Sequence, residues 1–220
     1  MKVFFAALSS VAVCAAAGAA TVPFTESFAV GSASWRDNGA VSEATWAPSG
    51  GPDGSAHVST ATNVNAAVFG ALTVFRGHSA FGSSGGAFVG NWIGEGVTQF
   101  SFDVRHNASM PLSFGTRFAA PANSPGASAV DFTPIAPGVW STVTIPINPA
   151  NPQFVSFGGS DFATIFSSIG NIQLILSVPG ALQGSGAVIT VDADNIRIVP
   201  GPAPAVLALA AAIGLMRRRR

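Results

Sequence analysis

The chain has 220 residues, 10 of them basic and 10 acidic, and a formal net charge of zero. Four consecutive arginines end the chain, so the region 21–199 holds five arginines against all ten acids, which leaves a net charge of −5. A mildly acidic region offers no basic face to a nucleic acid, and we therefore exclude nucleic acid as a partner.

The first twenty residues, MKVFFAALSSVAVCAAAGAA, have the pattern of a secretory signal peptide. Lys2 precedes an apolar run, and the small residues 17–19 suit cleavage by a signal peptidase. Lipidation of Cys14 is not expected, because Val13 stands where a lipid-modified cysteine needs a small residue. Since Cys14 is the one cysteine of the chain, the mature protein has no disulfide and depends on an ordinary hydrophobic core.

Residues 21–199 are long enough for one domain, and their apolar residues alternate as they do in β-strands. In VTQFSFDVR, at 97–105, the phenylalanines and Val104 share one face. Similar runs occur at 111–118, 140–147, 171–178 and 187–199, with turn-rich segments between them. One helical turn is expected in SDFATIFSSI, with Ser160 or Asp161 as its N-cap. The pattern predicts an all-β, antiparallel β-sandwich of the jelly-roll type.

Two of the expected strands carry acids at apolar positions of the alternation. Glu26 has the same parity as Phe24 and Phe28, so it is expected to point where the phenylalanines point. Asp192 and Asp194 share the parity of the isoleucines that follow them. Either a bulge near Asp194 resets the register or both faces of this strand are covered.

Five segments together resemble the galactose-binding-like jelly rolls, which include many carbohydrate-binding modules and laminin-B-like extracellular domains. The segments are ESF near the start of the domain, GGPDGSAHV, FVGNWIGEGVTQFSFDVR, GVWSTVTIPI and VDADNIRI. The resemblance implies a structural calcium ion between the first and last strands, held by Glu26 and Asp192 with the Asp53 loop as a third contributor. Calcium's preference for several oxygen ligands would explain an inward Glu26. The alternative is that Glu26 pairs with an arginine or lies at an edge in water.

Patterns typical of enzymes are present but lack their required context. Residues 82–86, GSSGG, match G-x-S-x-G, yet a strand-like run follows where a helix is needed. The three histidines are far apart in the sequence and give no zinc-binding spacing. A glycosidase needs two carboxylates, and nothing singles out a pair such as Glu95 and Asp103. We therefore predict no catalytic activity.

Three tryptophans are candidates for binding a sugar. Trp35, Trp46 and Trp92 lie among turn residues, where an exposed ring can stack on the apolar face of a sugar. The alternative is that each ring closes one end of the sandwich. Trp140, at a strand entrance, resembles the packing tryptophan of the family.

Residues 200–220 combine a proline motif, an apolar run and a basic cluster. The run is short for a transmembrane helix, and the arginines, Arg217, Arg218, Arg219 and Arg220, predict a cytoplasmic end. The order resembles the PEP-CTERM sorting signal, although Pro200, Gly201 and Pro202 place glycine where that motif has glutamate. The resemblance implies a transient membrane anchor, cleavage by an exosortase-like enzyme and release to the surface or extracellular matrix. A permanent C-terminal anchor is the alternative.

The sequence thus predicts a signal peptide at 1–20, a β-sandwich domain at 21–199 and a sorting signal at 200–220. The expected function is that of an exported, non-catalytic protein that binds glycans or associates with extracellular polysaccharide. A structural surface protein that self-associates and a glycan-cleaving jelly-roll enzyme are the alternatives.

Overall fold

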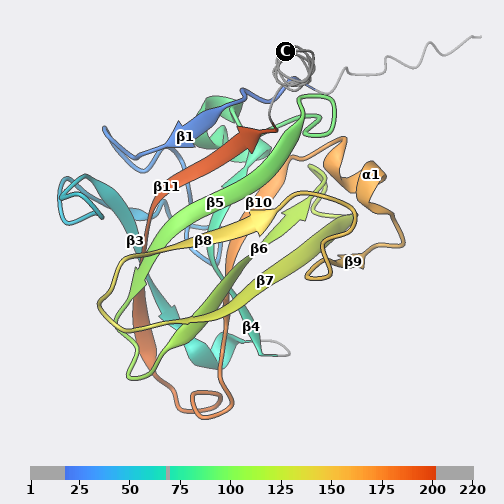
Figure 1. Cartoon of the computed structure of the whole chain (residues 1–220). Coiled ribbons are helices and arrows are strands. Elements are labelled where there is room, and N and C mark those ends of the chain that lie inside the picture. Colours follow the sequence, from blue (N-terminus) through green and yellow to red (C-terminus); the bar gives the residue numbers. More distant parts are fainter. Residues whose placement is uncertain (1–17, 68–69, 202–220) are drawn as a thin grey trace, which may run out of the picture.

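The computed structural model describes residues 18–67 and 70–201, which form two antiparallel sheets packed face to face (Figure 1). Sheet A contains β1 (Phe24–Glu26), β2 (Thr45–Ala47), β3 (His57–Asn63), β5 (Val97–His106), β8 (Ser141–Pro146) and β11 (Val188–Pro200). Sheet B contains β4 (Ala71–His78), β6 (Leu112–Ala119), β7 (Gly126–Ile135), β9 (Val155–Phe157) and β10 (Asn171–Ser177). The predicted all-β, antiparallel β-sandwich is confirmed.

The order of strands brings distant parts of the chain together. Sheet A runs β2-β3-β11-β5-β8, and β1 pairs with the end of β11, whereas sheet B runs β4-β10-β6-β7-β9. In the part of the chain that the structure describes, four short helices lie outside the sheets, namely η1 (Val64–Ala66), η2 (Ser79–Phe81), η3 (Ser83–Gly86) and α1 (Phe162–Phe166). The expected helical turn is α1, and the Asp161 side chain caps it by accepting a hydrogen bond of 2.8 Å from the Thr164 amide.

The alternation in β5 and β11 decides which side chains enter the core. Phe100, Phe102 and Val104 of β5 are fully buried, as their spacing predicts. In β11 the pairing with β5 slips between Asp194 and Arg197, and Asn195 there adopts a positive φ of 48°. This bulge turns the isoleucines after it back into the core, so the first of the two predicted explanations is confirmed.

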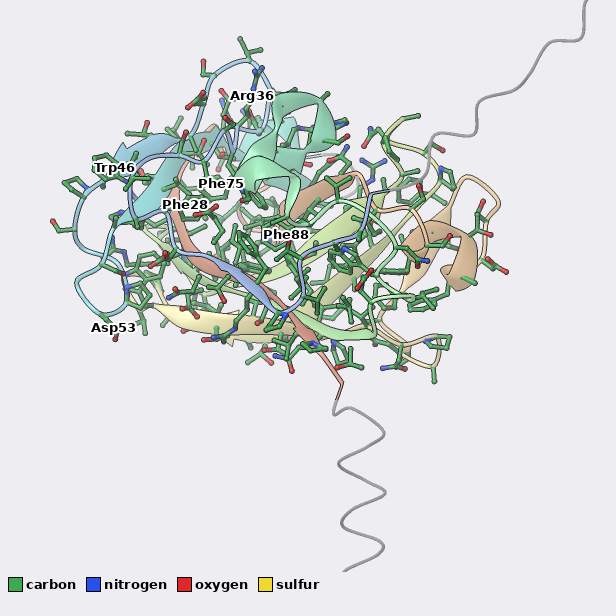
Figure 2. All side chains as sticks on the ribbon, turned by 90° about the horizontal axis from the view of Figure 1, so that it is seen from above. Phe28, Arg36, Trp46, Asp53, Phe75 and Phe88 are labelled. Carbon is green, nitrogen blue, oxygen red and sulfur yellow. The ribbon has the colours of Figure 1, made fainter. Side chains whose placement is uncertain are left out.

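The core is dominated by aromatic rings, several of which Figure 2 labels in the interior. Trp92 is fully buried, stacks on Phe100 with centroids 6.0 Å apart, and donates its indole N–H to the Phe88 carbonyl over 2.7 Å. Trp35 is also fully buried, and its indole donates to Ser84 Oγ over 2.9 Å. A Cβ on Gly77 would lie 2.7 Å from the Trp35 ring, so this site requires glycine.

The prediction that Trp35 and Trp92 are exposed platforms for a sugar is therefore wrong. Turn residues flank both, but a large apolar ring gains most by packing into the core once its N–H finds an internal acceptor. The rings close the space between the sheets, which is the alternative that the sequence left open.

The ends of the domain differ slightly from the predicted boundaries. Ala20 is buried, and the Thr21 amide donates to the Ala87 carbonyl over 2.8 Å. Pro200 is still part of β11, and the Gly201 amide donates to the Gly96 carbonyl over 2.9 Å. Most of the predicted signal peptide and the sorting signal from Pro202 to the four arginines lie outside the described residues. Within the described residues, the helices are too short or too polar to cross a membrane.

Replacing Trp92 by alanine is expected to lower the free energy of unfolding by about 3–5 kcal/mol, because a buried ring leaves a cavity. The control is Trp46→Ala, since Trp46 is 39% exposed and its loss should cost less. Denaturant unfolding of both variants provides the measurement. Equal losses would show that Trp92 is not the core residue described above.

A second prediction concerns His106, which is 2% exposed. Its Nδ1 accepts the Ala108 amide over 3.2 Å, so Nε2 carries the proton and donates to the Ile135 carbonyl over 2.9 Å. Burial lowers the pKa of His106 below its ordinary value of 6.5. Because the unfolded chain then takes up a proton more readily, His106 makes the domain lose stability as the pH falls from about 6.5 toward the lowered pKa.

Melting curves between neutral pH and pH 4 measure this effect. His106→Gln should reduce the loss of melting temperature between neutral pH and pH 4. His78→Gln is the control, because it should leave the part of this loss that His106 causes. An NMR titration in which His106 takes up its proton at or above pH 6.5 would contradict the prediction.

Candidate functional site

The third predicted tryptophan, Trp46, lies in β2 at the edge of sheet A (Figure 2). Its indole N–H donates to the Phe28 carbonyl over 2.7 Å, and 39% of the residue stays exposed. One edge of the ring is therefore fixed while another remains in solvent. Of the three predicted platforms, Trp46 alone keeps accessible surface.

On the outer face of sheet A, charged and aromatic side chains surround Asp192. Arg105 donates to Asp192 Oδ2 through both Nε and Nη2, over 2.8 and 2.7 Å. His57 Nε2 lies 3.8 Å from the other carboxylate oxygen. The Arg105 guanidinium sits 4.8 Å from the centroid of the Trp140 ring, and the Trp140 indole donates to the Gly50 carbonyl. Trp140 thus packs over an ion pair and holds the 50–55 loop in place.

Asp194 ties the same loop to β11. It is fully buried, it accepts hydrogen bonds from Ser55 Oγ over 2.8 Å and from the Asn195 amide over 2.7 Å, and burial raises its pKa. The Asn195 side chain extends the network by donating to Asp103 over 2.9 Å. The carboxylates of Asp103, Asp192 and Asp194 thus accept hydrogen bonds from within the domain. These bonds stabilise the outer face of sheet A.

The three predicted calcium ligands lie in different environments. Glu26 is half-buried on the side of the phenylalanines, as its parity predicts, and its Oε1 accepts the Phe28 amide over 2.9 Å. Asp53 is exposed at the tip of a loop (Figure 2), and the Asp192 carboxylate faces a guanidinium. Within the described residues, no three acids, histidines or cysteines cluster as metal ligands do. This set does not fit calcium as it stands, and calcium binding stays a prediction.

The G-x-S-x-G segment has a structural role. Ser83 Oγ donates to the Ser34 carbonyl over 2.8 Å, and Ser84 Oγ accepts the Trp35 indole. Both serines lie in η3, a short 3-10 turn rather than a strand-to-helix elbow. Their hydroxyls therefore lack the setting that activates a nucleophile.

The outer face of sheet B presents a different surface, which we call the arginine row: Arg36, Arg76, Gln173 and Arg117. At the edge of the sheet, Arg36 forms an antiparallel bridge with Arg76 on one side and with Glu43 on the other. Gln173 of β10 lies opposite Arg76 on one side and opposite Arg117 on the other. Side chains of directly paired residues point to the same face, so the four form one line across neighbouring strands.

The arginine row corrects the expectation that the domain has no basic face. Three of the five arginines in the region 21–199 belong to it. The net charge of −5 hides this face, because many of the acids lie elsewhere, including Asp103, Asp192 and Asp194 on sheet A. The outward parity of Arg117 in 111–118 is a signal of exposure, but its neighbours depend on pairing between strands far apart in the sequence.

Several hydrogen-bond donors of this face converge on Asn123, in the turn between β6 and β7. Its Oδ1 lies 2.7 Å from Arg117 Nη1, 2.6 Å from Asn171 Nδ2 and 3.0 Å from Gln173 Nε2. Arg117 Nη2 also donates to the Asn123 backbone carbonyl over 2.9 Å. One amide oxygen thus serves three donors, while Asn171 Oδ1 is buried and has no partner. The polar groups at this point are therefore imperfectly paired, because three donors share one oxygen while the buried Asn171 Oδ1 has no donor.

Charge and shape reinforce this imbalance. Burial lowers the pKa of Arg76, with Asp37 acting in the opposite direction, and burial together with the charge of Arg76 lowers the pKa of Arg117. Among the described residues, both ion pairs within 4.0 Å involve Asp192, so neither arginine is in a salt bridge. A cleft of about 360 Å³ lies beside Arg76, bounded by residues such as Asn38 and Thr73.

Aromatic rings position both ends of the row. The Arg117 guanidinium lies 4.3 Å from the centroid of Phe157, and that of Arg36 lies 4.0 Å from Phe81. Figure 2 shows Arg36 in the loop beside the short helices. Stacking on a ring fixes a guanidinium plane and leaves its N–H edge free to bind.

Comparisons with known proteins show the fold. No family model and no curated protein matches the sequence. The structure is similar to the CBM22-1–GH10 modules of endo-1,4-β-D-xylanase 10B from Clostridium thermocellum, solved with xylohexaose, with a TM-score of 0.51, 12% identity, and coverage of 83% of this chain and 29% of that chain. An exo-β-agarase gives a TM-score of 0.48, 15% identity, and coverage of 80% and 25%.

A family 30 carbohydrate-binding module gives a TM-score of 0.42 and 12% identity, with coverage of 84% of this chain and 89% of the module. This chain therefore spans between a quarter and a third of the xylanase and agarase chains and most of the module. At these identities the likeness to the xylanase structure concerns the β-sandwich alone.

If calcium binds through Glu26, a chelator is expected to lower the melting temperature of the domain, because a ligand that binds the folded state alone stabilises it. Glu26→Gln should remove the difference between melting curves with and without chelator. Asp131→Asn, on sheet B, is the matched control and should keep the difference. A melting curve that the chelator leaves unchanged would contradict calcium binding.

Proposed function

We propose that this domain is a non-catalytic glycan-binding module of an exported protein, and that the outer face of sheet B is its binding surface. The observation that carries the proposal is the convergence of Arg117, Asn171 and Gln173 on a single oxygen of Asn123. A sugar hydroxyl accepts as well as donates, so a bound glycan would offer a second acceptor to donors that now share one oxygen.

The setting of these groups suits an extended ligand. The donors sit on paired strands, whose spacing is rigid, so their positions hold without a ligand and less order is lost on binding. Gln173 and Asn171 are almost fully buried, which fixes their rotamers. Phe157 and the 69% exposed Val155 add apolar surface at the β9 end of the face. Rigid polar groups beside apolar side chains are what sugar recognition requires.

Binding rather than cleavage is favoured by the same geometry. Glycoside hydrolysis needs two carboxylates placed across the bond that is cleaved. The arginine row contains none, and Asp103 and Asp194 on the opposite sheet are occupied by internal donors. The xylanase structure that shares the fold holds xylohexaose, and we extend glycan binding as a class, not xylan, to this chain.

Export and sorting complete the proposal. The signal peptide would direct the chain out of the cytoplasm, and the C-terminal segment would anchor it until an exosortase-like enzyme releases it to the surface or matrix. Because β11 ends at Pro200 and the Gly201 amide still bonds to Gly96, cleavage after Gly201 would leave sheet A complete.

Affinity electrophoresis of residues 18–201 through gels that contain a panel of polysaccharides tests the binding. At least one polysaccharide should retard the domain, and Arg117→Ala should weaken that retention about tenfold, which corresponds to about 1.4 kcal/mol. Trp46→Ala tests the remaining predicted platform in the same gels.

The matched control is Arg197→Ala, because Arg197 lies on the outer face of sheet A and donates to Ser101 Oγ there. It should leave retention unchanged, and melting curves should show that each variant is folded. Loss of retention in Arg197→Ala but not in Arg117→Ala would indicate a binding site on sheet A and would contradict the proposed site on sheet B. A domain that ignores every polysaccharide and self-associates would favour a structural surface protein.

A further inference from the structure

We propose that the arginine row selects glycans that carry carboxylate or sulfate groups. This inference rests on the proposed function and adds the chemical class of the ligand. It concerns the row itself, Arg36, Arg76, Gln173 and Arg117, and the cleft beside Arg76.

The first step is the cost of gathering these cations. Neighbouring strands lie about 4.8 Å apart, so Arg76 and Arg117 flank Gln173 at two strand spacings. Burial lowers the pKa of both arginines, and repulsion by Arg76 lowers that of Arg117 further. A bound anion would offset both effects, whereas a neutral hydroxyl would offset part of the desolvation and none of the repulsion.

The second step is that, among the described residues, no acid forms a salt bridge with the row, because the carboxylate of Glu43, the bridge partner of Arg36, accepts Ser32 Oγ instead. Within the described part of the chain, no carboxylate lies within 4.0 Å of an arginine of the row. Asp37 attracts Arg76 from farther away and accepts the Val41 amide. On sheet A, by contrast, Arg105 donates to Asp192 through both Nε and Nη2. Arg105 is thus neutralised by a carboxylate, whereas the arginines of the row bind only neutral oxygens of the described residues.

The third step is the geometry of the free donors. Arg36 is held by Phe81 and by a bond from Nη1 to the Ala40 carbonyl, yet its buried Nε has no partner. The two terminal nitrogens of Arg117 donate to Asn123, and Arg76 Nε donates to the Asn38 carbonyl over 2.8 Å. A guanidinium fork matches the two oxygens of a carboxylate or sulfate, which bind more strongly than an amide oxygen. An acidic sugar would therefore compete with Asn123 for Arg117.

A general affinity for polyanions would not explain this surface. The domain has a net charge of −5, which repels a polyanion at long range, so attraction must come from the row alone. Single-stranded nucleic acid needs aromatic faces on which bases stack, and the two rings beside the row already hold Arg36 and Arg117. The row fits isolated acid groups along a sugar chain better.

The test compares polysaccharides that share a backbone and differ in charge. Polygalacturonate is paired with its methyl ester, and dextran sulfate with dextran, so the two pairs separate carboxylate from sulfate as the recognised group. In affinity electrophoresis or calorimetry, at least one acidic member should bind tenfold or more tightly than its neutral partner. Raising the salt from low to high concentration should reduce this preference, because exposed charges are screened.

Variants show whether the row carries the preference. Arg76→Gln and Arg117→Gln should each remove most of it, and Arg197→Gln should not. Arg117→Lys keeps the charge without the fork, so it should retain part of the preference for the acidic member. Asn123→Ala should strengthen acidic binding, because it removes the competing oxygen.

The outcomes separate the two proposals. If neutral and acidic members bind equally and Arg117→Gln weakens both, the face binds glycans but the selection of acidic groups is overturned. If no polysaccharide of either kind binds to a folded domain, both proposals fail. Binding of a single-stranded DNA oligonucleotide as tight as that of the acidic glycan would show a general anion site and would also overturn the inference.

Discussion

The bulge in β11 between Asp194 and Arg197 sets the arrangement of the whole sandwich. β11 lies at the centre of sheet A and pairs with β3, β5 and β1, so its register fixes theirs. Without the extra residue, either the isoleucines after the bulge or the acids before it would face the wrong side. With it, the side chains of both apolar runs enter the core, while Asp192 and Asp194 lie on the outer face of the sheet. There they accept hydrogen bonds from Arg105 and Ser55. The stability of this sheet and the polarity of its outer face therefore come from one irregularity.

The two outer faces satisfy their charges in opposite ways. On sheet A the buried carboxylates of Asp192 and Asp194 accept hydrogen bonds from Arg105, Ser55 and the Asn195 amide. On sheet B the cations lie in one row, aromatic rings orient them, and a single asparagine accepts for three donors. Burying charge is costly unless it is paired, and the acidic glycan that we propose would supply this pairing on sheet B.

Local patterns predicted much of the fold and little of the site. Alternation in VTQFSFDVR predicted the buried face of β5, and parity in the last strand predicted either a bulge near Asp194 or a strand covered on both faces, of which the structure shows the bulge. The tryptophans were misjudged because flanking turn residues do not tell which way a ring points, and Trp35 and Trp92 found internal acceptors. The arginine row was missed because it needs the register of β4, β10 and β6, which approach from distant parts of the sequence.

Net charge is a poor guide to a sandwich of this kind. In a strand, successive side chains alternate between two faces, so the choice of parity at each charged residue matters more than the total. Arg76 and Arg117 lie opposite the same glutamine, whereas Asp192 and Asp194 lie on the other sheet. A domain that is acidic as a whole, with a net charge of −5 over residues 21–199, thus gathers positive charge on one surface. In the proposed mode of binding, the net negative charge repels polyanions at long range. The arginine row attracts an acid group at short range, where a guanidinium can form two hydrogen bonds to it.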